Sequence, residues 1–574
     1  MQIVIARKKG FCFGVKRAVQ IAFREGSKKR IFSYGDLIHN PQVVEFLKKR
    51  GISMTEDISL LNEKDTILIR AHGITPREKE KIKKKGIKII DATCPRVLKV
   101  QSIVKRCAKE KKEVIIIGDK KHSEVKGLMG YAENRARVVE TEKELLTLLK
   151  QKNRKFCLVS QTTQNRDKFE KMKKIAKKFG KDIEIYDTIC EETDERQEEV
   201  KKLSKICDAV IVVGGKNSAN TKRLAEIVKE RGKVSFHIET EKEIPAHIKK
   251  FEKIGVTAGA STPNWLIQRV VYRLEEMAGE KNRIKKFFLS LWRFFIRSYL
   301  YVAFSAASLC YACSRLLGIE PSLSFEWITA SYIFAMHLLN HLTEPLSLDI
   351  NYPAKSDFYR KHRKLLVILG TLGVISSLGV SWFLGIKTFG TVLLLSLLGL
   401  LYRFKISFKK LKYRSLSEIP GSKDIFLALA WASMLVILNI FSTKGRISGN
   451  AFVVFLFAFS MAFSRSLIYS LRDLQGDMMT GVESIPTIIG EERTKLLGVF
   501  TITLTFGVLF LSYITHMTSI LSLFLLINLA YYAVLFFLPQ DSAIYYKDVT
   551  FETIVDGNLV LSFIVSYVWF LVSS

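Results

Sequence analysis

One short pattern occurs three times in the first half of the chain. An apolar, strand-like run ends at a cysteine, and an amphipathic helix pattern begins directly after it. The cysteines are Cys12, Cys94 and Cys190, and the runs before them are residues 3–6, 87–90 and 183–186. A strand followed at once by a helix is the unit of parallel α/β structure. The pattern therefore predicts three equivalent thiols that converge on one object.

Polar turns after later strands keep the same register. His39 lies 27 residues after Cys12, His122 lies 28 residues after Cys94, and Ser218 lies 28 residues after Cys190. A second set of strand-to-turn junctions carries His72, Thr162 and Ser261. Ligands of open α/β sheets bind at the carboxyl ends of the strands. Residues 1–280 are thus predicted to form a trilobed α/β domain with pseudo-threefold symmetry, in which polar side chains surround the cysteines.

The cysteine set limits the chemistry of this centre. Three thiolates do not complete a structural zinc site, and the first half contains no C-x-x-C motif. Three thiolates on a 4Fe–4S cluster would leave one iron open for a substrate oxygen. No secretory signal is recognisable, so reduced cysteines are expected. The alternative is that the three thiols are buried core residues.

The polar turns suggest an anionic substrate. His39, His72 and His122, with Ser218, Asn220 and Ser261 at the remaining turns, would form a ring of donors suited to a diphosphate. Glu124 follows His122 by two positions and is a candidate proton source, which Thr162 would orient or relay. The alternative for Glu124 is an ordinary surface glutamate.

These motifs stand in the order found in one family. They are Gly10-Phe11-Cys12-x-Gly14-Val15, His39-Asn40-Pro41, Ala71-His72-Gly73, Asp91-Ala92-Thr93-Cys94-Pro95, His122-x-Glu124-Val125-x-Gly127, Gln161-Thr162-Thr163 and Asn217-Ser218-x-Asn220. Residues 1–280 resemble the 4-hydroxy-3-methylbut-2-enyl diphosphate reductases of the LytB type. The resemblance implies a 4Fe–4S cluster on Cys12, Cys94 and Cys190. It also implies reductive loss of the substrate hydroxyl as water, with electrons from a ferredoxin or flavodoxin, to give isopentenyl and dimethylallyl diphosphate.

The same resemblance assigns the remaining roles. Glu124 and Thr162 become the proton-delivery pair. The residues implied to bind the substrate are His39, His72, His122, Thr162, Asn217, Ser218, Ala219, Asn220 and Ser261. Many members carry serine where Ala219 stands, so one hydroxyl contact is replaced here by the backbone N–H alone.

The net charge of +34 admits a second function class, nucleic-acid binding. The basic residues are, however, spread over helix faces and around apolar segments, and an anionic substrate or membrane face explains the sign equally well. Residues 281–297 interleave Lys and Arg with Phe and Trp, which predicts a basic amphipathic linker at a membrane interface.

The rest of the chain, residues 298–574, is predicted to be an all-α polytopic membrane domain. Nine apolar segments are expected at about 298–318, 325–342, 364–385, 388–404, 424–442, 450–471, 496–516, 518–538 and 557–573. Basic residues such as Lys355, Arg403 and Arg472 fall in the loops after the second, fourth and sixth segments. The positive-inside rule then predicts an inner-membrane protein with its first half in the cytoplasm.

The loop after the sixth segment contains Asp473 and Asp477, four residues apart on one helical face. Such a pair could hold Mg²⁺ with a diphosphate. The stretch resembles the second Asp-rich motif of the UbiA-type intramembrane prenyltransferases. Their first motif is degenerate here, and its candidate Mg²⁺ ligands are Asn340 and Glu344. The predicted protein is a reductase fused to a membrane domain that transfers prenyl groups; the alternative is that the membrane half only anchors the chain or binds lipid.

Overall fold

The computed structural model describes the chain except for residues 27–30, 152–153, 181, 280–282, 343–344, 403–415, 417–418, 443–448, 540–541 and 574. The chain forms two compact units, Met1–Ala278 and Gly279–Ser574. Each unit is described by itself.

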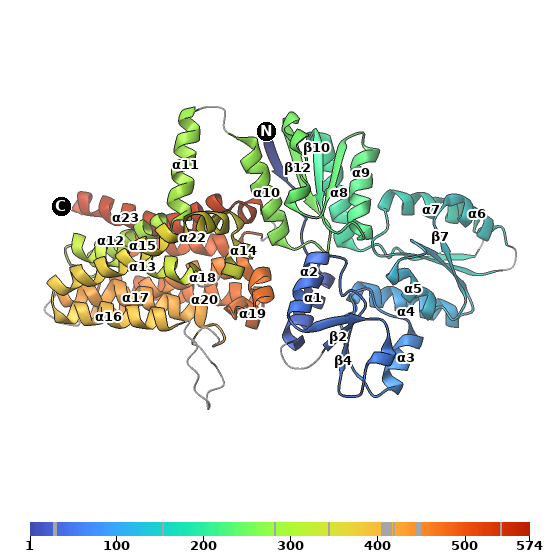
Figure 1. The fold of residues 1–574 in the computed structure, drawn as a ribbon, viewed down its shortest axis with the longest axis horizontal. Helices are drawn as coiled ribbons and strands as arrows, with labels where there is room; N and C mark the ends of the chain where they lie inside the picture. Colours follow the sequence, from blue (N-terminus) through green and yellow to red (C-terminus); the bar gives the residue numbers. More distant parts are fainter. Residues whose placement is uncertain are drawn as a thin grey trace. The chain divides into compact units, whose positions relative to one another are not determined.

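The first unit contains three four-stranded parallel sheets (Figure 1). Their strand orders are β3-β2-β4-β5, β7-β6-β8-β9 and β11-β10-β12-β1. The strands are β1 (Gln2–Ile5), β2 (Ile31–Tyr34), β3 (Ile52–Thr55), β4 (Thr66–Ile69), β5 (Lys88–Asp91), β6 (Glu113–Ile117), β7 (Ala136–Val139), β8 (Phe156–Ser160), β9 (Ile183–Ile185), β10 (Ala209–Val213), β11 (Val234–Ile238) and β12 (Lys253–Ala258). In the third sheet β1 takes the position that β5 and β9 hold in the others, with Ile3 opposite Ile254. The three lobes therefore share one topology.

Ten helices flank these sheets in the described part of the first unit. They are α1 (Phe13–Gly26), α2 (Pro41–Lys49), α3 (Pro76–Lys84), α4 (Pro95–Lys109), α5 (Ser123–Tyr131), α6 (Glu142–Leu149), α7 (Arg166–Phe179), α8 (Glu191–Ile206), α9 (Ala219–Glu230) and α10 (Asn264–Ala278). Strands β4, β8 and β10 are buried along their whole length. A strand that is covered on both faces reads as a continuous apolar run. The predicted trilobed α/β fold is confirmed.

The second unit is helical. Its helices are α11 (Arg283–Arg297), α12 (Leu300–Leu316), α13 (Leu323–Leu342), α14 (Pro345–Asn351), α15 (Pro353–Phe383), α16 (Ile386–Leu401), α17 (Ser422–Ser442), α18 (Gly449–Thr480), α19 (Ile485–Ile489), α20 (Glu491–Ile514), α21 (Leu521–Phe524), α22 (Leu526–Phe537) and α23 (Asp548–Ser573). Each of the nine predicted apolar segments falls on one of them, namely α12, α13, α15, α16, α17, α18, α20, α22 and α23. The predicted all-α architecture is confirmed.

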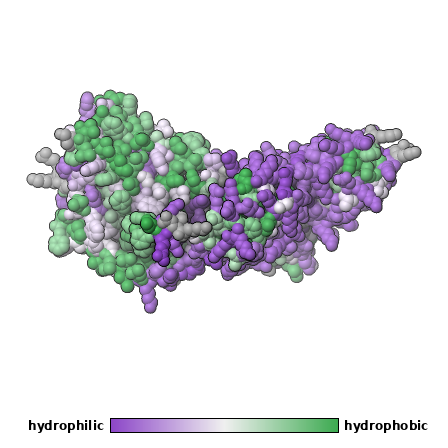
Figure 2. Space-filling view, turned by 90° about the horizontal axis from the view of Figure 1, so that it is seen from above, coloured by the Kyte–Doolittle hydropathy of each residue, from purple (hydrophilic) through white to green (hydrophobic). Residues whose placement is uncertain are grey.

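Not every one of these helices is long enough to span a bilayer alone. Within the described residues, five are long and apolar enough, and six if the bent pair α11 and α12 is one span. Helix α16 and the segment Leu521–Phe537 are shorter apolar pieces. Figure 2 shows apolar residues gathered on the surface of this unit, whereas the surface of the first unit is mainly hydrophilic.

The basic, aromatic segment before α12 forms helix α11, and residues 281–282 lie outside the described residues. Helix α11 makes an angle of 70° with α12. The indole N–H of Trp292 donates a hydrogen bond to the hydroxyl of Thr553 on α23, at 3.1 Å. Phe287 and Phe288 remain exposed. The segment is thus a packed helix of the second unit, with an exposed aromatic face.

Candidate active site

The three cysteines occupy equivalent positions at the starts of α1, α4 and α8. Each backbone N–H donates a hydrogen bond to a carbonyl of the neighbouring polar turn: Cys12 to Ala260, Cys94 to Ala71 and Cys190 to Thr162, at 3.0, 2.9 and 2.9 Å. Each cysteine carbonyl accepts the first helical hydrogen bond, from Lys16, Leu98 and Asp194. The backbone therefore presents all three thiols in the same way.

The thiols line one cavity of about 100 Å³. The candidate residues that share this cavity are His39, His72, His122, Glu124, Thr162, Ser218, Ala219, Asn220 and Ser261. Burial raises the pKa of the Cys12 thiol to about 12, and the positive charge of Arg196 opposes this rise. Burial also raises the pKa of Cys94, to which the neighbouring Cys190 contributes. The electrostatic interactions between the cysteines fit their convergence on one centre.

Gly14 allows two of the cysteine-bearing elements to approach each other. A Cβ atom at this position would lie 2.5 Å from Sγ of Cys94. Real Cβ atoms do not come so close to another heavy atom, so a side chain here would push the thiol away. The glycine after Cys12 is thus required for the thiol arrangement.

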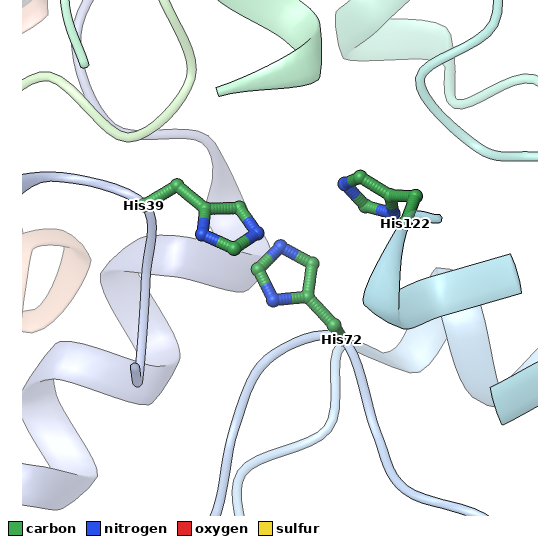
Figure 3. A group of neighbouring side chains, drawn as sticks. All are labelled: His39, His72 and His122. Carbon is green, nitrogen blue, oxygen red and sulfur yellow. The ribbon is translucent and has the colours of Figure 1, made fainter. Parts of the chain in front are cut away.

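The three histidines also come together, from three separate turns (Figure 3). Their nearest ring nitrogens all lie within 4.8 Å of one another. The rings of His39 and His72 are stacked, with centroids 4.5 Å apart, and His122 meets both edge-on. Burial lowers the pKa of His122 to about 4, to which His39 contributes, and burial also lowers the pKa values of His39 and His72. The rings are therefore neutral until an anion binds.

Glu124 lies beside the histidines at the start of α5. Its two carboxylate oxygens accept hydrogen bonds from the N–H and the hydroxyl of Thr162, at 2.7 and 2.8 Å. The residue is 1% exposed. Burial raises the pKa of Glu124, and the Thr162 hydrogen bonds oppose the rise. A buried carboxyl with a raised pKa is suited to donate a proton near neutral pH.

The residues around the start of α9 differ in their placement. Ser218 is the N-cap of α9, and its hydroxyl accepts from the N–H of Thr221. Ala219 and Asn220 line the cavity with it. Asn217 is exposed and is not among the lining residues, because it precedes the cap and its side chain lies on the solvent side of the turn. The structure therefore brings three of these four candidates to the cavity.

Several polar atoms at the cavity have no hydrogen-bond partner among the described residues. They are Nδ1 of His72, both amide atoms of Asn220, and Nε and Nη1 of Arg196. Buried polar groups are nearly always paired, so these atoms indicate a bound polar ligand. Sequence reasoning missed Arg196; its position six residues after Cys190, on one helix, is the signal that could have found it.

The donor set fits an iron–sulfur cluster. Three thiols converge on one cavity, a glycine makes room beside one of them, and a buried cation stands nearby. Clusters are held by cysteine thiolates and carry negative charge, which such a cation offsets.

A second cavity, of about 480 Å³, lies within the helical unit. Asn340 and Asp473 both line it, and Glu344 lies outside the described residues. The predicted loop around Asp473 and Asp477 is wrong: α18 continues to Thr480, so both acids lie within a helix. Asp473 accepts a hydrogen bond from Tyr352 at 2.7 Å, and Asp477 pairs with Lys423 at 2.9 Å.

Two basic residues expected in cytoplasmic loops are also placed differently. Lys355 lies in α15, buried, and pairs with Glu552 at 2.6 Å. Arg472 lies in α18, buried, and pairs with Asp548. A charge that is buried is stable only when it is paired. Sequence reasoning missed Lys423, although a charged residue at the start of an apolar helix is itself a functional signal.

Comparisons with known proteins match both units. A family model described as LytB protein matches residues 3–275, and one described as UbiA prenyltransferase family matches residues 360–546. The 4-hydroxy-3-methylbut-2-enyl diphosphate reductase of Geobacter sulfurreducens is 43% identical over 287 residues, which cover 49% of this chain and 100% of that protein. That of Caldanaerobacter subterraneus is 41% identical over 288 residues, with 49% and 99% covered.

Solved structures are similar to each half separately. The E-1-hydroxy-2-methyl-but-2-enyl-4-diphosphate reductase of Plasmodium falciparum is 33% identical and covers 47% of this chain and 87% of that chain, with a TM-score of 0.46. A UbiA homolog from Archaeoglobus fulgidus, bound to GPP and Mg²⁺, is 14% identical and covers 48% and 99%, with a TM-score of 0.35.

The first unit is a three-lobed parallel α/β protein with a three-thiol cavity. Through this unit the chain belongs to the LytB family of 4-hydroxy-3-methylbut-2-enyl diphosphate reductases, and its second half carries a UbiA prenyltransferase family domain. Together with its apolar helices, the UbiA domain makes the chain a multi-pass membrane protein.

Proposed function

We propose that the chain is a membrane-bound 4-hydroxy-3-methylbut-2-enyl diphosphate reductase with a prenyl-handling second half. The observation that carries the proposal is the convergence of Cys12, Cys94 and Cys190 with the histidine trio and Glu124 in one cavity. The family membership of the first half supports it. The products would be isopentenyl and dimethylallyl diphosphate.

The three cysteines would hold a 4Fe–4S cluster. When bound, such a cluster supplies electrons and an open iron that polarises the substrate oxygen. The cluster-facing helix starts add backbone N–H groups, which favour negative charge. A ferredoxin or flavodoxin would deliver the electrons.

The diphosphate would bind to the histidine trio, with Ser218, Asn220 and Ser261. Neutral imidazoles that gain a proton as the anion arrives turn into charged donors, which form stronger hydrogen bonds. The unpartnered Nδ1 of His72 and amide of Asn220 are donors of this kind. The site thereby fixes one end of the substrate.

Glu124 would protonate the departing hydroxyl. Its carboxyl lies beside the cavity, and the two hydrogen bonds from Thr162 fix its orientation. Hydroxide is a poor leaving group, so a positioned acid lowers the barrier for its loss as water. Thr162 acts as the positioning residue for this acid.

In the helical unit, Asp473 and Asp477, with Asn340 and Glu344, are the proposed Mg²⁺ ligands. The Lys423 pairing of Asp477 means that this ion would have to displace an internal cation. The reductase half would face the cytoplasm, with the helices in the inner membrane. An anchor without prenyl-transfer activity remains the second candidate for this unit, because Asp477 is already neutralised in the structure.

The test is an anaerobic preparation of the full chain with its cluster reconstituted. We expect an absorbance band near roughly 400 nm, typical of iron bound to thiolates. We also expect reduction of 4-hydroxy-3-methylbut-2-enyl diphosphate with dithionite and a mediator. A chain that binds iron but does not turn over this substrate would refute the proposed activity.

A further inference from the structure

Arg196 is a buried cation with incomplete hydrogen bonding. It lies on α8, is 3% exposed and lines the three-thiol cavity. Its Nη2 atom lies 3.6 Å from a carboxylate oxygen of Glu192, while Nε and Nη1 have no partner among the described residues. Burying a charge is costly unless it is paired and hydrogen-bonded. The open donors therefore call for an anion in the cavity.

Two other arginines near the cavity are already satisfied. Nη1 of Arg70 donates to Glu56 at 2.9 Å, and Arg223 contacts both carboxylate oxygens of Asp119 at 3.0 Å. These are the arginines whose charge acts on the histidine trio. The side of the cavity proposed for the diphosphate therefore has its own cations.

Arg196 acts on the other side of the cavity, where the thiols lie. Its charge is the strongest electrostatic influence on Cys12 after burial. It belongs to the helix that Cys190 caps. Glu192, one turn earlier on that helix, accepts the N–H of Phe13 at 3.0 Å, next to Cys12. Arg196 is thus fixed between two of the three cysteine-bearing elements.

We propose that Arg196 is the charge partner of the cluster and raises its reduction potential, an inference that rests on the proposed function. Each electron that enters adds one negative charge to a centre already held by three thiolates. A buried cation stabilises the more negative form, because charges interact strongly where water is excluded. No bond forms or breaks in this step: the cluster gains the electron that an external low-potential, one-electron carrier loses.

The test is an anaerobic redox titration of the reconstituted full chain in detergent, followed by electron paramagnetic resonance with dithionite as reductant. In Arg196→Gln we expect the midpoint potential of the cluster to shift to more negative values. Arg196→Lys keeps the charge and should retain most of the wild-type potential. The matched control is Lys201→Gln, which removes another buried cation of α8 that already pairs with Asp167 and Glu198. Its midpoint should equal the wild-type value.

Glu192→Gln provides an independent arm in the opposite direction. This side chain offsets the guanidinium charge, so its neutralisation should shift the midpoint to more positive values, while the amide oxygen still accepts from Phe13. An Arg196→Gln protein with a bound cluster and an unchanged midpoint overturns the inference. If Arg196→Gln does not fold, an unchanged midpoint in Glu192→Gln overturns it. Failure of the wild-type chain to bind any cluster would instead refute the proposed function.

Discussion

The carboxylate of Glu124 is held at both oxygens by Thr162, through the backbone N–H at 2.7 Å and the hydroxyl at 2.8 Å. Residue Thr162 also accepts the N–H of Cys190 through its carbonyl, at 2.9 Å. One residue thus fixes the candidate acid relative to a candidate cluster ligand. This coupling gives the site a defined geometry before substrate binds.

Glu124→Gln should remove most of the turnover and leave the cluster in place. The amide can still accept hydrogen bonds from Thr162, but it has no acidic proton to donate. A positioned acid typically contributes about 10²- to 10⁴-fold, so a loss in this range is expected. The measurement is the steady-state rate at equal iron content. Near-normal turnover would refute the acid role, and Glu226→Gln, on the exposed side of α9, is the control.

Thr162→Val should move the alkaline limb of the pH–rate profile to higher pH. The hydroxyl stabilises the carboxylate form of Glu124, so its loss raises the pKa of that carboxyl further. A hydrogen bond to a charged group corresponds to a shift of about one pH unit. The acid would then stay protonated to higher pH, although the overall rate falls because its orientation is lost. A profile that does not move would show that the hydroxyl has no such influence.

Pyrophosphate binding should be accompanied by proton uptake. Burial, with repulsion from His39, lowers the pKa of His122 to about 4, so the ring is neutral near pH 7. An adjacent anion raises the pKa again, and the affinity therefore increases as the pH falls from 8 to 6, by at most about tenfold per unit for each proton taken up. Calorimetry in buffers of different ionisation enthalpy measures the uptake. His122→Asn should reduce it, and an unchanged uptake would exclude this histidine.

Gly14→Ala should prevent cluster assembly. The added Cβ would lie 2.5 Å from Sγ of Cys94, so the thiol must move out of register. Iron and sulfide content per chain should fall to a small fraction of the wild-type value. Gly127→Ala is the matched control, because its Cβ would meet nothing closer than 3.9 Å. Full iron content in Gly14→Ala would show that Cys94 is not a ligand.

Asp473→Ala should abolish prenyl transfer and leave reductase turnover unchanged. Asp473 lines the helical cavity, while the reductase cavity is formed entirely by the first unit. The assay uses the full chain with a polyprenyl diphosphate, Mg²⁺ and a panel of aromatic and lipid acceptors. If the wild-type chain transfers to none of them, the anchor interpretation of the second half is preferred.

Much of the first unit follows from local sequence. The alternation of apolar runs and amphipathic helices predicts parallel α/β structure, and the regular spacing of Cys12, Cys94 and Cys190 predicts the three lobes. In the second half, the nine apolar segments predict the helices because their length and composition are local properties. The continuation of α18 through Asp473 to Thr480 was not predicted, since paired acids and a glycine look like a loop when their buried partners are unknown.

The tertiary structure alone decided which side chains meet. Strand β1 completes the third sheet by pairing with β12, and no local pattern links residues so far apart in sequence. The close approach of Gly14 to Cys94, the open donors of Arg196 and the pairing of Lys423 with Asp477 likewise depend on packing between distant elements. The sequence determined the three equivalent thiols, because each sits at its own strand-to-helix junction. The charges around them became visible only after folding, because a charge acts through distance in space and through burial, and neither is encoded by its neighbours along the chain.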